Sequence, residues 1–111
     1  HCISGYPTPV EQTNLSKIQD MRQRFSVEVG FSDHTIGLVA AVAAVSLGAT
    51  IIEKHITMKR SDGGPDSEFS IEPDELKTLV QNCNDAHAST SASLSVATTR
   101  ASVLARRFHY A

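Results

Sequence analysis

Two short apolar segments that are each followed by a histidine constrain this chain most strongly. Residues 27–31 (VEVGF) and 50–53 (TIIE) are typical of buried strands, and His34 and His55 follow them. Residues 36–47, rich in Ala and Val, predict a helix between them that is covered on most sides. Strand, helix and strand in this order predict parallel strands joined by a right-handed crossover. Both histidines then lie at the C-terminal edge of an α/β sheet, where such folds bind ligands.

The segments before this unit extend the alternation. Residues 1–4 predict a further short strand, and the prolines after it predict a loop. Thr13 or Asn14 is expected to cap the next helix, and Gly48 to end the helix over 36–47. The apolar face of the first helix is expected to be Leu15, Ile18, Met21 and Phe25.

The second half of the chain is expected to hold a loop, a helix and a change of composition. Residues 58–70 predict a long loop, of the kind that is often functional. Glu72 and Pro73 begin a helix whose apolar residues share one face. We place a boundary at residue 87, with an α/β domain over 1–87 and a Ser/Ala-rich helix or linker over 88–111. The residues that favour a helix there by their spacing are Leu94, Ala97, Ala101, Leu104 and Phe108.

Composition limits the partners and the compartment. The 111 residues are 41% hydrophobic and 20% charged with a net charge of −2, which argues against nucleic acid or an anionic membrane as partner. No apolar run could span a bilayer, and no signal pattern is present. Cys2 and Cys83 form no CxxC pair, so we expect thiols in a reducing cytoplasm and leave a disulfide between them open. The start inside an apolar strand without Met suggests a fragment or a processed product.

His34 and His55 are the first candidates for chemistry. Each alone is more often a hydrogen-bonded structural residue than a ligand, but two histidines after neighbouring strands indicate a site for a divalent transition metal. Two protein ligands leave positions for water and substrate, as in a site that polarises a carbonyl group. We therefore predict that both residues are metal-binding and catalytic.

Ser32 and Glu53 each stand two positions before one of these histidines and share its strand face. Glu53 is expected to orient the metal shell or to accept a hydrogen bond from a ligand, or else to form an ion pair with a lysine or arginine. Ser32 donates to an anion or caps the following helix. By the same alternation Asp33 and Lys54 point to the opposite face, as packing or surface charges.

Two loop residues complete the candidates. Asp66 follows two glycines that would let the backbone approach a ligand, and its carboxylate could accept sugar hydroxyls; a surface turn is the alternative. Tyr6 follows the first predicted strand and lies either at the ligand edge or as an anchor of the proline-rich loop.

At these residues the chain resembles the N-acetylneuraminate (sialic acid) synthase family. The resemblance runs from residue 1 to about residue 87 and implies a partial TIM (β/α)8 barrel of about the last three β/α units. The segments that carry it are 1–9 (HCISGYPTP), 14–15 (NL), 30–35 (GFSDHT), 48–57 (GATIIEKHIT), 64–66 (GPD) and 69–76 (FSIEPDEL).

The resemblance implies a cytoplasmic transferase of sialic acid and polysaccharide biosynthesis. Such an enzyme condenses phosphoenolpyruvate with an N-acetylhexosamine, such as N-acetylmannosamine, to a nonulosonic acid. A divalent metal is implied, Mn²⁺ first and otherwise Mg²⁺ or Co²⁺, and so is a homo-oligomer, most simply a dimer. The matching residues are His34 and His55 for the metal, Ser4 and Ser32 for phosphoenolpyruvate, Tyr6 and Asp66 for the sugar, and Glu53 for catalysis.

The chain also departs from that family. The phosphate-binding lysines of the first barrel half are absent, so we expect the isolated chain to be inactive and to self-associate through uncovered apolar surface. Ser4 stands where some members carry Asn, and Ser67 where many carry His. The alternatives are a non-catalytic binding or assembly module of the spore-coat type, and a hydrolase that activates water on the two histidines. The acceptor sugar, of the sialic, legionaminic or pseudaminic pathway, is left open.

Overall fold

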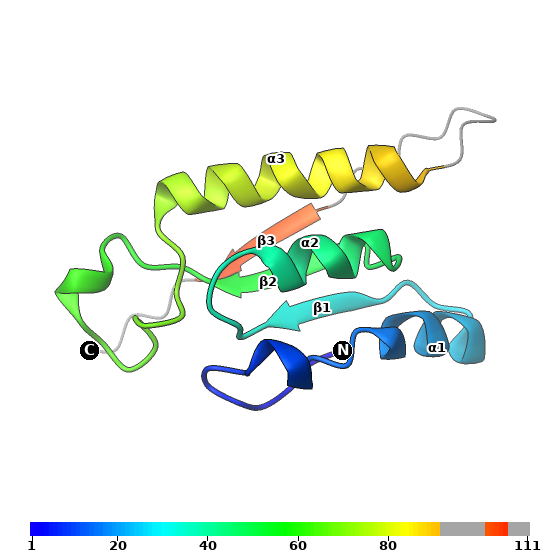
Figure 1. Ribbon diagram of the computed structural model, residues 1–111, viewed down its shortest axis with the longest axis horizontal. Helices are drawn as coiled ribbons and strands as arrows, with labels where there is room; N and C mark the ends of the chain where they lie inside the picture. Colours follow the sequence, from blue (N-terminus) through cyan, green and yellow to red (C-terminus); the bar gives the residue numbers. More distant parts are fainter. Residues whose placement is uncertain (92–101, 107–111) are drawn as a thin grey trace.

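The chain folds into a three-stranded parallel sheet with a helix before each strand (Figure 1). The computed structural model describes residues 1–91 and the backbone of 102–106. The sheet order β1-β2-β3 follows the chain order, as consecutive crossovers produce, and the prediction of an α/β fold with parallel strands is confirmed. The elements are α1 (Ser16–Phe25), β1 (Gly30–Asp33), α2 (Val39–Ser46), β2 (Ile51–His55), α3 (Pro73–Thr90) and β3 (Ser102–Arg106), with single 3-10 turns at Val10–Gln12 and Arg60–Asp62.

The outer strands differ from the prediction. Residues 1–4 form no strand of their own but a parallel bridge from Cys2 to Ser32, so they still lie beside β1. At the other edge, Ser102–Arg106 is a strand that pairs with β2, and the helix predicted across this stretch is wrong there. Backbone pairing with β2 outweighs a weak helical spacing. Leu94, Ala97, Ala101 and Phe108 lie outside the described residues.

The helix ends follow the prediction at two of four places. Gly48 follows α2 with a φ of 101°, as a glycine after a helix commonly does, and α3 begins at Pro73 with a capping box between Glu72 and Glu75. No side chain caps α1 or α2, whose first turns follow Leu15 and Leu38. The predicted caps are therefore wrong for these two helices.

The hydrophobic core lies between the sheet and the helices, where α2 and α3 run side by side (Figure 1). The predicted face of α1 is confirmed for Ile18, which is fully buried, whereas Phe25 is exposed. Cys83 belongs to the core and burial raises the pKa of its thiol to about 11, while Cys2 is exposed; both are free thiols. Among the described residues, no helix is both long and apolar enough to cross a membrane. The core residues are Ile18, Val29, Phe31, Ala40, Ala41, Ala44, Val45, Ala49, Ile52, Ile71, Leu79 and Cys83.

Candidate functional site

The two predicted histidines meet at the C-terminal ends of β1 and β2. The strands pair in register, with Ser32 opposite Glu53 and Asp33 opposite Lys54, so the next residues, His34 and His55, are brought together. Their ring centroids lie 5.3 Å apart at an interplanar angle of 76°. Both residues are buried, at 4% and 8% exposure. The sequence-based expectation that they converge on one site is thus met by the geometry.

Aromatic rings enclose the histidine pair on two sides. Tyr6 stacks on His34 with centroids 4.2 Å apart, although 56% of the tyrosine remains exposed. Phe69 is buried and lies 5.0 Å from the ring of His55 and 5.8 Å from that of Tyr6. Phe69 was not among the predicted site residues, although it is an aromatic residue at the end of a polar loop and begins the segment 69–76 that carries the family resemblance.

The ring of His34 is oriented by the N-terminal segment. Its Nδ1 lies 2.9 Å from the carbonyl oxygen of Ile3, to which it donates, and 3.9 Å from the Sγ of Cys2. A proton held on Nδ1 leaves the lone pair of Nε2 available, which is the form in which imidazole binds metals.

His55 is held close to the carboxylate of Asp66. The distance from His55 Nδ1 to Asp66 Oδ2 is 3.4 Å. Burial lowers the pKa of His55, and the negative charge of Asp66 opposes this shift to a lesser extent. The net effect favours the neutral ring at physiological pH, as a metal ligand requires.

Ser32 and Glu53 contact one another on the same face as the histidines. The Ser32 hydroxyl donates to Glu53 Oε1 at 2.9 Å. The interpretation of Ser32 as a helix cap is therefore wrong, because its hydroxyl is directed across the sheet to β2. Both side chains are partly buried. The pair therefore lies on the sheet surface next to the histidines, two residues earlier on each strand.

Asp33 and Lys54 lie on the other face, as the strand alternation predicted, but not at the surface. Their side chains are 0% and 1% exposed and form an ion pair of 2.8 Å. The surface-charge interpretation is wrong for both residues, because the helix layer covers this face of the sheet.

The structure thus brings six of the seven predicted site residues together. Ser4 is the seventh; its side chain is exposed, and it follows Ile3, whose carbonyl contacts His34. Ser4 therefore lies at the rim. The six residues that meet are Tyr6, Ser32, His34, Glu53, His55 and Asp66.

Comparison with known proteins places the chain in a family. Residues 1–94 match the NeuB family. The chain belongs to the NeuB family. A curated relative, the N,N'-diacetyllegionaminic acid synthase of Legionella pneumophila, is 45% identical over 86 residues, which are 78% of this chain and 24% of the relative. This NeuB-family chain thus spans about a quarter of the length of the curated relatives it matches.

Two solved structures resemble the NeuB-family chain in fold as well as sequence. One is the N-acetylneuraminic acid (sialic acid) synthetase of Leptospira borgpetersenii in complex with citrate, with a TM-score of 0.81, 37% identity, and coverage of 89% of this chain and 35% of the other. The second is the spore coat polysaccharide biosynthesis protein SpsE of Bacillus subtilis, with a TM-score of 0.76, 38% identity, and coverage of 86% and 28%.

The donor set at the site fits a divalent cation. Metal–nitrogen bonds are about 2 Å long. Two imidazole rings whose centroids lie 5.3 Å apart are therefore close enough to share one ion. Within residues 1–91, no three His, Cys, Asp or Glu side chains are arranged to hold a metal ion.

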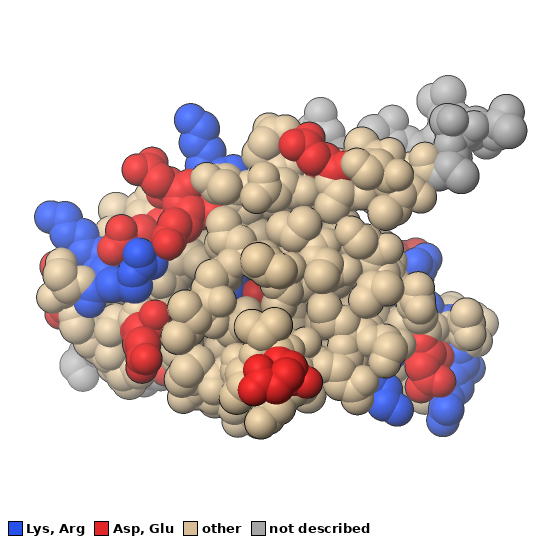
Figure 2. Space-filling view, viewed as in Figure 1, with Lys and Arg blue, Asp and Glu red and all other residues tan. Residues whose placement is uncertain are grey.

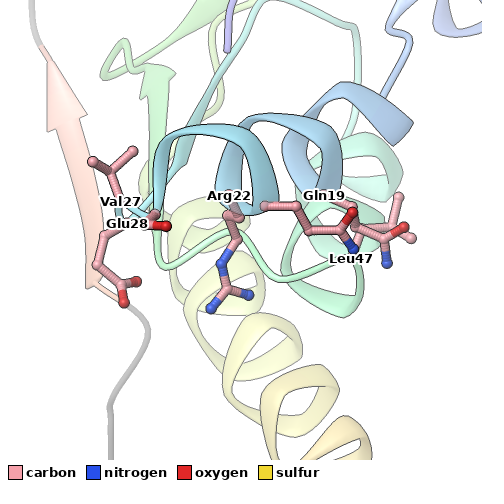
Figure 3. A pocket seen from close by; sticks show the side chains of 7 residues that line it. Gln19, Arg22, Val27, Glu28 and Leu47 are labelled. Carbon is pink, nitrogen blue, oxygen red and sulfur yellow. The ribbon is translucent and has the colours of Figure 1, made fainter.

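A separate depression lies at the opposite end of the strands (Figure 3). It has a volume of about 640 Å³ and is lined by the end of α1, the segment before β1, and Leu47. The residues on its wall include Gln19, Arg22 and Glu28. None of the predicted site residues lines it, so the candidate site at the histidines and this depression are distinct.

Proposed function

We propose that this chain supplies part of the (β/α)8 barrel of a nonulosonic acid synthase, a transferase that condenses phosphoenolpyruvate with an N-acetylated hexosamine. The observation that carries the proposal is the convergence of His34 and His55 at the ends of paired parallel strands. The resemblance to synthases of legionaminic and sialic acid supports it. The relatives' lengths also support a larger barrel, of which this chain is about a quarter.

His34 and His55 would hold a divalent metal, with Mn²⁺ as the first candidate. When bound there, such an ion supplies Lewis-acid polarisation of the acceptor sugar's carbonyl oxygen. The protein's own contribution is to orient both rings and to keep His55 neutral. The Ile3 carbonyl orients the ring of His34, and burial beside Asp66 favours the neutral form of His55.

Ser32 and Glu53 would handle the phosphoenolpyruvate end of the reaction. Ser32 has a single hydroxyl proton, now donated to Glu53. For Ser32 to donate to an anionic substrate, its hydroxyl must turn away from Glu53 and break this hydrogen bond. Glu53 is then able to accept a hydrogen bond or a proton from the reacting groups. Ser4, at the rim, would add a second hydroxyl donor to the same anion.

Tyr6 and Asp66 would contact the acceptor sugar. Tyr6 presents an exposed ring beside the histidines, and a flat aromatic surface suits the apolar face of a sugar. The Asp66 carboxylate is partly exposed and has oxygen lone pairs to accept hydroxyl protons besides its contact with His55.

The first test is a titration of the full chain with Mn²⁺, in which the electron paramagnetic resonance signal of the free ion measures how much metal is bound. Wild type is expected to bind, and His34→Ala and His55→Ala to weaken binding by at least about tenfold, because each removes one of two protein ligands. His87→Ala, in α3 and away from the site, is the matched control. Equal Mn²⁺ affinity in all four proteins would contradict the metal assignment.

Activity is tested in the longer protein to which we assign the chain. Synthesis of a nonulosonic acid from phosphoenolpyruvate and N-acetylmannosamine should be lost in both histidine variants, and the 111-residue chain alone should be inactive. The likeness to the spore coat protein favours one alternative, a binding or assembly module of surface-polysaccharide biosynthesis. If the longer protein binds the metal but forms no nonulosonic acid from any N-acetylhexosamine, that result would favour the binding or assembly module.

A further inference from the structure

A buried ion pair lies directly behind the histidine site. Lys54 Nζ is 2.8 Å from Asp33 Oδ2, and both side chains are almost fully buried beneath the helix layer. Asp33 precedes His34 in the chain and Lys54 precedes His55. The pair therefore joins β1 to β2 at the last paired residues before the two rings.

The same two side chains also bind the backbone on the far side of His34. Lys54 Nζ donates to the carbonyl oxygen of Thr35 at 2.7 Å. The Thr35 N–H donates to Asp33 Oδ1 at 2.8 Å. His34 is thus enclosed between two residues that are tied to one another and to β2, while its own ring is held by Ile3.

Stability alone does not explain why charges occupy this position. Replacing a buried ion pair by apolar residues of similar volume is often neutral or stabilising, because the interior offers little compensation for lost hydration. The pair does supply three directional hydrogen bonds, which tie Asp33 and Thr35 to one another and to Lys54, and apolar side chains could form none of them.

We propose that Asp33 and Lys54 are positioning residues, which hold the backbone around His34 against β2 so that the rings of His34 and His55 keep the separation at which they share a cation. The last clause rests on the proposed function. The placement of the rings themselves does not, and it is measurable without metal.

The test compares four forms of the full chain: wild type, Lys54→Met, Lys54→Met with Asp33→Leu, and Leu79→Ala. Leu79 is fully buried in α3 and belongs to the core rather than to the site. Each form is examined by thermal unfolding, by nuclear Overhauser effects between the ring protons of His34 and His55, and by Mn²⁺ titration.

We expect Lys54→Met to unfold at a lower temperature, since Asp33 is left buried without its cation, and the double variant to recover much of the loss. The ring-to-ring effect should nevertheless remain weakened in the double variant, with Mn²⁺ affinity reduced about 10- to 100-fold, as for other residues that orient metal ligands. Leu79→Ala should unfold early but keep both the ring contact and the affinity.

A double variant that keeps the wild-type ring contact would overturn the positioning role. A different result would be that wild type does not bind Mn²⁺ but that the ring contact is still lost in the double variant. That result would overturn the proposed metal function and leave the positioning role supported. The two failures are thereby distinguishable.

Discussion

At the scale of single residues, the charge of His55 depends on two opposing influences. Burial lowers its pKa, and the Asp66 carboxylate 3.4 Å away acts in the opposite direction. Asp66→Asn removes the opposing charge and should therefore lower the pKa of His55 further. An NMR titration of the His55 ring protons measures this, with Glu68→Gln, an exposed acid of the same loop, as control.

The same variant should change how stability depends on pH. The unfolded chain takes up a proton on this histidine near its ordinary pKa of 6.5, whereas the folded chain resists it. The free energy of unfolding therefore falls as pH drops below about 6.5, until the folded pKa is reached. Asp66→Asn should widen that window toward lower pH. A His55 pKa that rises or does not move in Asp66→Asn would contradict the assigned contact.

The residues of the site differ in how far the sequence could reveal them. His34, His55, Ser32 and Glu53 were predictable because strand alternation and parallel register fix which side chains share a face. The Ile3 carbonyl was not, because a backbone oxygen has no sequence signature. The burial of Asp33 was not predictable either, because it depends on an ion pair with Lys54 on the neighbouring strand that the chain order does not specify.

At the scale of elements, the cap prediction failed for α2. Ser32 is a suitable cap residue by type, but its hydroxyl donates to Glu53 on β2 instead. A tertiary partner thus outcompetes a local preference. The start of α3 was predictable because its cap residues, Glu72 and Glu75, bind within one turn.

Glu75 connects α3 to the loop that carries Asp66. Its Oε2 accepts the Glu72 N–H at 2.8 Å and also the guanidinium of Arg60. We predict that Glu75→Ala destabilises the chain by about 1 kcal/mol through the lost cap, which is within the usual range for cap removal. Thermal unfolding measures it, with Lys77→Ala, an exposed residue of the same helix, as the control that should change little.

The acid dependence of this contact has a defined sign. The hydrogen bond from Arg60 and then that from the Glu72 backbone hold the pKa of Glu75 below its ordinary 4.5. Its contribution to stability is therefore present above about pH 4.5 and is lost as the pH falls through the folded pKa. Because the pair is partly exposed, salt should weaken the contribution. An equal loss of stability in Glu75→Ala at pH 7 and pH 3 would contradict this account.

At the scale of the whole molecule, the sheet has one face under helices and one face without such cover among the described residues. The face of Ser32 and Glu53 is only partly buried, and Ile51 on it is 47% exposed. The parallel order of β1 and β2 was predictable from the helical crossover segment between them. The place of β3 was not, because its pairing with β2 is a long-range contact that a weak helical pattern obscured.

The outer surface of α2 is also apolar. Figure 2 shows charged side chains gathered toward the two ends of this face, with few over its middle. Val39, the first residue of α2, is 76% exposed, and Ile36, in the turn before the helix, is 58% exposed. Contiguous apolar surface of this kind favours association, and we predict that the average mass of the isolated chain, measured by light scattering, rises with concentration.

Val39→Glu tests whether α2 contributes to that association. An acidic residue in the first turn suits the helix dipole, so the variant should remain folded. Removing one valine from an apolar contact costs roughly 1.5 kcal/mol or more, so the association constant should fall about tenfold. Asn82→Glu adds the same charge at an exposed position of α3 and should leave the association constant unchanged. A constant monomer mass at all concentrations would mean that this apolar surface is tolerated in water, and an equal effect of both variants would trace the association to net charge rather than to α2.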